Sequence, residues 1–269
     1  MLNSLITKLR PTVLSQVCNE LLNKKSIPHK IFPRNPTSGR SVSDLFVGRS
    51  DGFETIFAAE NVLTLLSDVE VNITHKFIYL SNDGQIAKYE VVTTHEPIYL
   101  HQLNPPVEGI YLFIHLTEYH DNGTSINLSK LYRQHRNLTG FAATGQSLMN
   151  YVHGNIGAVY VAKSGRLKSI VGQSAIKTYS IQEKFVEGYQ YDFVICNPTS
   201  RNLDVKVSGF DEEFNEQMQS FFSISPFGMA VFKNYGEQMF LSFTSRLPVT
   251  RPIVFERSEN DTRLNVFHS

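Results

Sequence analysis

Residues 51–71 read DGFETIFAAENVLTLLSDVEV, and residues 187–207 read EGYQYDFVICNPTSRNLDVKV. The two stretches align without a gap, so that Asp51 matches Glu187 and one constant offset relates every later pair. Apolar and polar residues alternate in both, which predicts a strand, a turn and a second strand in each copy. The identical pairs are Gly52/Gly188, Phe57/Phe193, Asn61/Asn197, Asp68/Asp204, Val69/Val205 and Val71/Val207.

Two of these repeated pairs have a structural explanation. Gly52 and Gly188 directly precede aromatic strand starts, where a turn with positive φ favours glycine. Asn61 and Asn197 end the predicted strands, and asparagine side chains cap turns by bonding to their own backbone. The repeated residues therefore predict a duplicated fold rather than a duplicated active site.

A second block closes each copy. Arg136 is followed by His153, and Arg251 by His268, at the same spacing. Side chains that recur at one spacing in two copies of a module are expected at equivalent places in the fold. Between the blocks, YLFIHLT (111–117) resembles MFLSFTS (239–245).

Beyond residue 43 the chain consists of short alternating or β-branched runs punctuated by turns, which is typical of an all-β sandwich or barrel. The simplest organisation is two tandem copies of one module, over residues 44–153 and 154–269. The strand–turn–strand opening of each copy resembles the opening hairpin of an immunoglobulin-like sandwich, although the chain has no Trp. This resemblance implies two duplicated immunoglobulin-like β-sandwich modules and no particular activity.

Residues 1–43 differ in pattern from the rest. Apolar residues recur at helical spacing through residues 2–22, which predicts a short amphipathic helix that docks on the body of the protein or on a partner. Residues 24–40, KKSIPHKIFPRNPTSGR, contain five basic residues and no acidic one, as in a linker or an arm that clamps an acidic neighbour. No apolar run has the length of a signal peptide or a membrane span, so we expect cytoplasmic synthesis and no membrane span.

Composition excludes several classes of protein. The 25 Lys and Arg residues balance the 25 Asp and Glu residues, so a surface built wholly to hold nucleic acid is not expected. The two cysteines, Cys18 and Cys196, lie in unrelated contexts and do not form a disulfide framework. The chain has no phosphate-binding or dinucleotide-binding motif, and we expect no cofactor.

Histidine is concentrated in one stretch, which raises the question of a metal site. Within it, Glu118 and His120 share one face of a predicted strand and could join a third ligand. The alternative is that these histidines are ordinary polar or core residues, and no HExxH or His-x-His pattern is present. The histidines of this stretch are His95, His101, His115, His120, His135 and His153.

The repeated arginine and histidine give the better candidate site. Arginine suits carboxylate, phosphate or sulfate groups, and histidine can complete the hydrogen bonding. The surroundings of the first copy are rich in polar and aromatic groups, with Tyr132 before Arg136 and Asn155 after His153. The structural alternative is that each arginine pairs with an acidic residue of its own module. Arg136, His153, Asn155, Arg251 and His268 are the candidate binding residues.

Two functions remain open. The first is a non-enzymatic binding or assembly protein with a protein or glycan partner, such as a surface or virion component, which also allows a homo-oligomer. The second is a hydrolase or metal-assisted enzyme with a site on the first module or between the modules. The catalytic candidates are His153, Arg136 and Tyr132, and the enzyme hypothesis requires these side chains to converge on one pocket.

Overall fold

The computed structural model describes eleven parts of the chain. They are residues 41–61, 64, 70–120, 133–134, 137–146, 149–173, 175–181, 185–234, 240–247, 251–258 and 264–268. The helix and arm expected over residues 1–43 lie outside this description, except that Ser41, Val42 and Ser43 begin the first strand.

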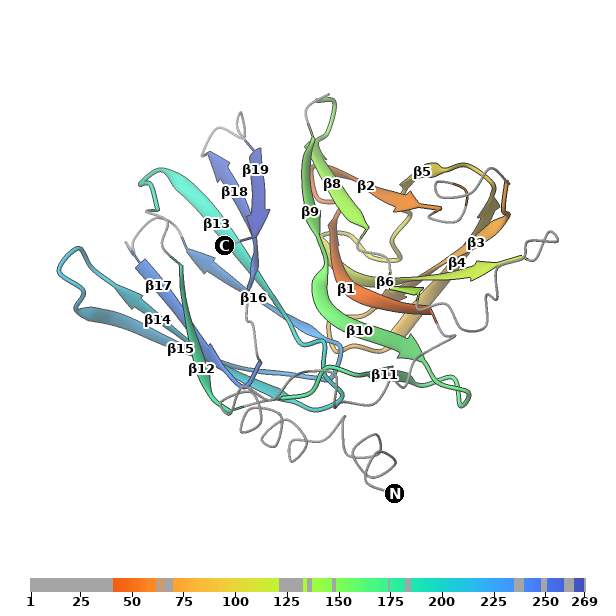
Figure 1. Ribbon diagram of the computed structural model, residues 1–269. Coiled ribbons are helices and arrows are strands. Elements are labelled where there is room, and N and C mark those ends of the chain that lie inside the picture. The colour runs from red at the N-terminus through yellow and green to blue at the C-terminus, as the bar shows by residue number, and fades with distance from the viewer. Residues whose placement is uncertain are drawn as a thin grey trace, which may run out of the picture.

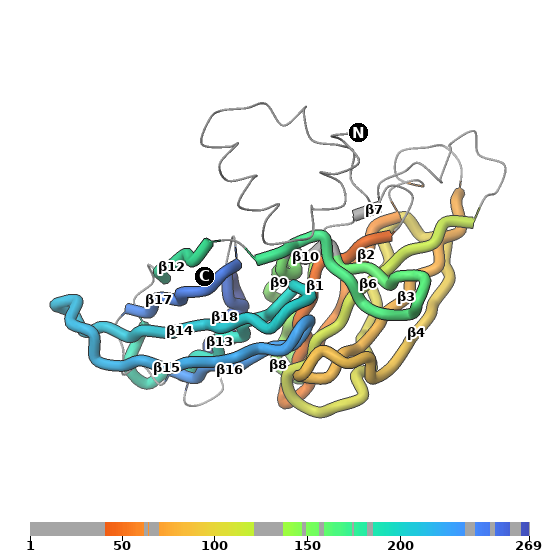
Figure 2. Tube along the Cα trace, turned by 90° about the horizontal axis from the view of Figure 1, so that it is seen from below, coloured from red at the N-terminus to blue at the C-terminus, as the bar shows by residue number. Residues whose placement is uncertain are grey.

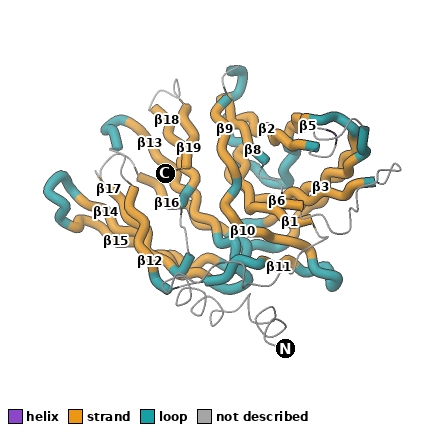
Figure 3. Tube along the Cα trace, viewed as in Figure 1, coloured by secondary structure: helices purple, strands orange, loops and turns teal. Residues whose placement is uncertain are grey.

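Nearly every element of the described chain is a β-strand, and Figure 3 shows strands and loops only. This confirms the all-β class predicted from the alternating pattern. Among the described residues, no helix is long and apolar enough to cross a membrane.

The first half of the chain forms two sheets (Figure 1). One has the order β11-β10-β1-β6-β3-β4, with β7 also paired to β1, and the other has the order β5-β2-β8-β9. The strands are β1 (Ser41–Arg49), β2 (Phe53–Glu60), β3 (Ile73–Leu80), β4 (Ile86–Thr94), β5 (Ile98–Gln102), β6 (Ile110–Tyr119), β7 (Arg133–Gln134), β8 (Leu138–Ala143), β9 (Asn150–His153), β10 (Asn155–Val161) and β11 (Leu167–Ser169).

The second half also forms two sheets, with the orders β12-β17-β14-β15 and β16-β13-β18-β19. Figures 1 and 2 show the two halves lying side by side. The strands are β12 (Lys177–Ile181), β13 (Tyr189–Cys196), β14 (Leu203–Phe210), β15 (Glu216–Ile224), β16 (Met229–Asn234), β17 (Phe240–Ser245), β18 (Ile253–Ser258) and β19 (Leu264–His268).

The strand pairing of the second half repeats that of the first. The order β1-β6-β3-β4 corresponds to β12-β17-β14-β15, and β5-β2-β8-β9 corresponds to β16-β13-β18-β19. Both ends of β2 and β13 are related by the offset read from the sequence. Strand β18 begins and ends 115 residues after β8 begins and ends, which is also the separation between His153 and His268. Strands β10 and β11 extend the sheet of β1, so the pairing of the first half continues past residue 153.

The expected immunoglobulin-like hairpin is absent from the described strands. The two strands predicted to form it, β2 and β3 in the first half and β13 and β14 in the second, lie in different sheets. The polar segment between them is a crossing from one sheet to the other. Asn61 Nδ2 donates to the carbonyl of Val71 across this crossing at 2.7 Å, and in the second copy Asn197 Nδ2 donates to the carbonyl of Arg201 at 2.7 Å. The prediction that Asn caps a turn is confirmed, but the turn changes sheets.

The glycine prediction is also confirmed. Gly52 has φ 73° and Gly188 has φ 81°, in the left-handed region where a Cβ is strained. The first strand, β1, is not predicted by the alternating pattern, because nearly all of its residues are buried.

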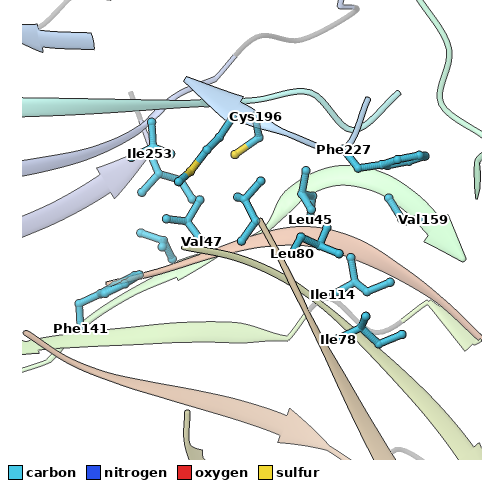
Figure 4. Close-up of a cluster of buried hydrophobic side chains, with 14 of the residues drawn as sticks. Leu45, Val47, Ile78, Leu80, Ile114, Phe141, Val159, Cys196, Phe227 and Ile253 are labelled. Carbon is cyan, nitrogen blue, oxygen red and sulfur yellow. The ribbon is translucent and has the colours of Figure 1, made fainter. Parts of the chain in front are cut away.

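Three large apolar cores of the described residues separate four stacked sheets. In the first half, Phe46 and Phe113 pack on Phe57 of the facing sheet at centroid distances of 5.0 and 5.4 Å. The second half has an equivalent core around Phe193 and Phe243, whose centroids lie 5.8 Å apart. The third core lies between the halves (Figure 4).

This third core, the junction core, joins the outer side of the β1-β6-β3-β4 sheet to the outer side of the β16-β13-β18-β19 sheet, and Phe53, Phe141 and Val152 of the β5-β2-β8-β9 sheet also pack in it. Alternate residues of one strand face different cores: Phe46 faces the first core, whereas Leu45 and Val47 face the junction. The same holds for Phe193 and Val194 in β13. The central strands of the middle two sheets are therefore buried on both sides, whereas β4 at the edge is exposed on one side. The junction core contains Leu45, Val47, Phe53, Ile78, Leu80, Leu112, Ile114, Leu116, Phe141, Val152, Val159, Val194, Cys196, Phe227, Met229, Ile253, Phe255 and Val266.

Asn197 gives a test of the sheet crossing. Its Nδ2 donates to the carbonyls of Arg201, Ile224 and Ser225, and its Oδ1 accepts from the backbone N–H of Thr199. Because Asn197→Ala leaves several buried groups unpaired, we expect the free energy of unfolding to fall by about 3 kcal/mol in urea denaturation. The exposed Asn202→Ala is the control and should change it by less than about 0.5 kcal/mol. Equal effects of the two substitutions would contradict the role of Asn197.

Candidate functional site

An ion-pair network crosses the junction between the halves. Arg49, at the end of β1, donates from Nη1 to Asp192 Oδ2 of β13 at 2.7 Å. It also donates from Nε and Nη2 to Asp51 at 2.6 and 2.9 Å. Arg257 of β18 reaches the same Asp192 oxygen at 3.4 Å. The network fixes the register of one half against the other.

The Arg49 guanidinium is almost fully enclosed. Its side chain is 3% exposed, and its Cζ lies 4.4 Å from the ring centroid of Phe53 and 5.0 Å from that of Phe255. Burial alone would lower the pKa of Arg49, but the hydrogen bonds to Asp51 and Asp192 raise it above its ordinary value. Arg49 is therefore a charged group held inside the protein by its partners.

The structure brings two of the predicted site residues together. His153 ends β9 and His268 ends β19, and their rings stack at a centroid distance of 4.3 Å. His268 Nε2 donates to the backbone carbonyl of His153 at 2.6 Å. The equivalent positions predicted from the Arg–His spacing therefore meet across the junction.

The environment of His268 changes its ionisation. Burial lowers the pKa of His268 from 6.5 to about 4, and the nearby His153 and Arg251 oppose its protonation further. Backbone hydrogen bonds with His153 and Arg251 act in the other direction. His268 is consequently neutral near pH 7 and acts as a packed, hydrogen-bonded ring.

Asn155 lies half-buried at the junction instead of in an open site. It pairs with Leu45 in the sheet register and hydrogen-bonds with the thiol of Cys196 across the junction. Burial raises the pKa of Cys196 to about 12, so this thiol is not an activated nucleophile. Asn155 is thus part of the packing between the halves.

Two further candidates cannot be located. Tyr132 and Arg136 lie outside the described residues, so the convergence of Tyr132, Arg136 and His153 on a pocket remains a prediction. Arg251 is exposed and lies close to His268.

The histidine-rich stretch has separate partners for its members. Glu118 pairs with Lys76, and His120 Nε2 bonds to Thr74 Oγ1 at 2.6 Å. Among the described residues, no three His, Cys, Asp or Glu side chains are grouped so that they could hold a metal ion.

Two buried histidines form a polar contact in the core of the first half. His75 Nδ1 and His115 Nε2 lie 2.8 Å apart, and His115 Nδ1 lies 2.9 Å from Asn137 Nδ2. His101 instead pairs with Glu90 at 2.7 Å. His101 and His115 therefore each have a polar partner within the protein.

The outward side of the β5-β2-β8-β9 sheet carries apolar side chains, and we call it the open face. Leu100 is 59% exposed and Ile98 is 58% exposed on β5. Tyr151 of β9 lies over Gly140, where an added Cβ would approach Tyr151 Cε1 to 2.6 Å. The open face comprises Ile56, Ala58, Ile98, Leu100, Leu138 and Tyr151, with Glu54 and Glu60 beside them.

The opposite end of the stack is the outward side of the β12-β17-β14-β15 sheet, which we call the polar face. Hydroxyl groups lie along it, and Thr178 Oγ1 and Thr244 Oγ1 lie 2.8 Å apart. It has two hollows, of about 540 and 470 Å³. The larger is lined by Ile176, Asp204, Lys206, Phe221, Ser223, Thr244 and Arg246, among others.

No known protein family matches the chain, and no curated protein matches it.

The Arg49–Asp192 pair can be tested by a double-mutant cycle. Asp192→Asn removes one charge from a buried pair, and we expect the free energy of unfolding to fall by about 3 to 5 kcal/mol. Arg49→Met with Asp192→Leu should cost markedly less than the sum of Arg49→Met and Asp192→Leu measured singly, because the double change leaves neither member of this buried pair without the other. The losses at Asp51 and Arg257 occur in the single variants as well and cancel in the cycle.

The exposed pair of Lys76 and Glu118 is the matched control for this cycle. Its coupling energy should be below about 1 kcal/mol, because solvent screens both charges. Additive effects of the Arg49 and Asp192 substitutions in chemical denaturation would show that the pair does not couple the halves.

The lowered pKa of His268 predicts an acid-sensitive junction. In the unfolded chain His268 takes up a proton near pH 6.5, whereas in the folded protein it does so near pH 4. The free energy of unfolding should therefore fall as the pH drops from about 6.5 to about 4. His268→Gln should flatten this dependence in denaturation curves recorded across that range. The exposed His95→Gln should leave the slope unchanged, and an unaltered slope in His268→Gln would refute the assignment.

Proposed function

We propose that this protein is a non-enzymatic binding and assembly protein that engages its partners through the outer faces of its stacked sheets. We also propose that residues 44–153 and 154–269 are two copies of one β-sandwich module. Strands β10 and β11, within residues 155–169, then belong to the second copy in sequence but pair with the β1 sheet of the first. The open face carries the functional proposal.

The open face has the composition expected of a contact surface. Its apolar side chains are contiguous across four strands, and large exposed apolar patches mark interaction sites in soluble proteins. Tyr151 adds an aromatic ring with a polar end, a residue type enriched at interfaces. A protein partner is therefore the first expectation for this face.

The equivalent face of the second half supports this proposal. Strand pairing makes Ile98 equivalent to Met229 and Leu100 equivalent to Val231. Both Met229 and Val231 pack in the junction core, against the first half. The same sheet face thus already serves as a contact surface once within this chain.

A glycan partner is favoured by a different observation, the larger hollow of the polar face. Phe221 is 72% exposed beside Lys206 and Thr244, which combines an aromatic surface with hydrogen-bonding groups. Pockets of this kind bind small polar ligands through an apolar wall and a few placed donors.

The proposal is tested by biolayer interferometry on the immobilised full-length chain. The probes are the chain itself and a panel of neutral and acidic oligosaccharides, and we expect saturable binding of at least one. Leu100→Lys should weaken binding of the protein probe roughly tenfold, about 1.4 kcal/mol, whereas Phe221→Ala should weaken binding of a saccharide.

Val91→Lys is the matched control, because Val91 is 57% exposed on β4, away from both faces. It should change either affinity by less than about twofold. Absence of binding by every probe, or equal effects of Leu100→Lys and Val91→Lys on the protein probe, would contradict the proposal.

A further inference from the structure

The main apolar contact between the two halves uses a different face of each half, and beside it the equivalent ends of β9 and β19 meet through His153 and His268. The first half contributes the outer side of β1-β6-β3-β4, together with Phe53, Phe141 and Val152 from the inner side of its other sheet. The second half contributes the outer side of β16-β13-β18-β19. The second of these sheets corresponds to β5-β2-β8-β9 of the first half. The interface is therefore heterologous, or head to tail.

In a heterologous interface each half contributes a different face, so each half keeps exposed the face that corresponds to the one its neighbour has buried. The first half retains its open face, which corresponds to the side of the second half that is buried in the junction. The second half retains its polar face, which corresponds to the side of the first half that is buried there. A chain built this way has complementary ends.

The positions on the open face match those of the junction one by one. Ile98 and Leu100 of β5 have their counterparts in β16. Leu138 corresponds to Ile253, because Leu138 pairs with Ala58 of β2 and Ile253 pairs with the equivalent residue of β13, Val194. Tyr151 corresponds to Val266 in the same way. Ala58 corresponds to Val194 at the offset that relates β2 to β13. All three of these second-half residues are buried in the junction core.

The polar face has features that suit the open face. Its two hollows provide concave surface for the protruding side chains of β5, and Phe221 supplies an exposed apolar group. Lys206 and Arg246 line the larger hollow, while Glu54 and Glu60 lie on the open face. The polar face also carries carboxylates, since Asp204 lines the same hollow and Lys206 pairs with Glu216 at 3.2 Å. Contact between two open faces would bring Glu54 and Glu60 of both copies together without any Lys or Arg among the described residues of that face, which favours the polar face as the partner.

We infer that the partner of the open face is the polar face of a second copy of this chain, so that copies associate head to tail in the layer order already present inside each chain. This inference rests on the proposed function and names its protein partner. Such stacking extends into filaments or closes into a ring.

The intermolecular contact is weaker than the junction. Asp192, which pairs with Arg49 in the junction, corresponds to Ile56 on the open face at the offset that relates β2 to β13. The buried ion pair is therefore not repeated between copies, and the polar face lacks the apolar layer of the first half. Association should consequently depend on protein concentration.

The test is sedimentation velocity of the full-length chain over a concentration series, with two blocked variants. Ile98→Lys/Leu100→Lys blocks the open face, and Ile176→Asp/Phe221→Asp blocks the polar face. Wild-type protein should form species of two and more copies, and each variant alone should remain monomeric. An equimolar mixture of the two variants should form a species of two chains and nothing larger, because one intact face of each kind remains.

Other outcomes overturn the inference in distinguishable ways. A polar-face variant that still dimerises alone shows contact between two open faces, which leaves the proposed binding function intact. If the wild-type protein is monomeric but binds a saccharide, the head-to-tail inference is wrong and the proposed binding function stands. If it is monomeric and binds no probe, both proposals are wrong.

Controls keep the test interpretable. Circular dichroism melting should show that each variant is folded, and the milder Leu100→Gln and Phe221→Gln replace any variant that is not. Val91→Lys should associate as the wild type does.

Discussion

The architecture depends on one sheet that is buried on both sides. Strands β1, β3 and β6 send alternate side chains into the core of the first half and into the junction core, so both sides are mostly apolar and the polar groups buried there need partners. Arg49 is one of these buried polar groups, along with the His75–His115 pair, and it is tolerated because Asp51 and Asp192 supply carboxylates to its guanidinium. The apolar layers provide the free energy of association between the halves, while this ion pair restricts how they can align.

The two halves share one strand arrangement, but the outer sides of their corresponding sheets differ in polarity. In the first half, the outer side of the β1 sheet is apolar because the second half covers it. The corresponding strands β14 and β17 instead present Lys206, Ser208, Ser242 and Thr244 on that side. Pairing in the sheet is set by backbone hydrogen bonds, which both halves share, whereas the chemistry of each face follows what lies against it. A strand arrangement that occurs twice can therefore present different outer faces through its side chains alone.

The sequence predicts those features that are local or repeated. The constant offset between the copies locates β2 and β13, and the Arg–His spacing identifies two histidines that meet in space. Strand order is not predictable, because a period of two defines the faces of a strand but not its neighbours. Strand β1 escapes prediction because burial on both sides removes the alternation. The Arg49–Asp192 pair joins residues 143 positions apart in different sheets, and no local pattern connects them. Tyr132 and Arg136 lie outside the described residues, so that part of the site remains a prediction.

The junction core also constrains the order of events during synthesis. It contains Leu45 from the first described strand and Val266 from the last, so it cannot close until Val266 has left the ribosome. Until then, the emerging first half presents the bare apolar side of its central sheet. Contacts between residues so distant in sequence also form slowly, because a long loop must close first. The head-to-tail arrangement of the halves therefore makes the nascent chain more exposed to aggregation than either half would be with its faces covered locally.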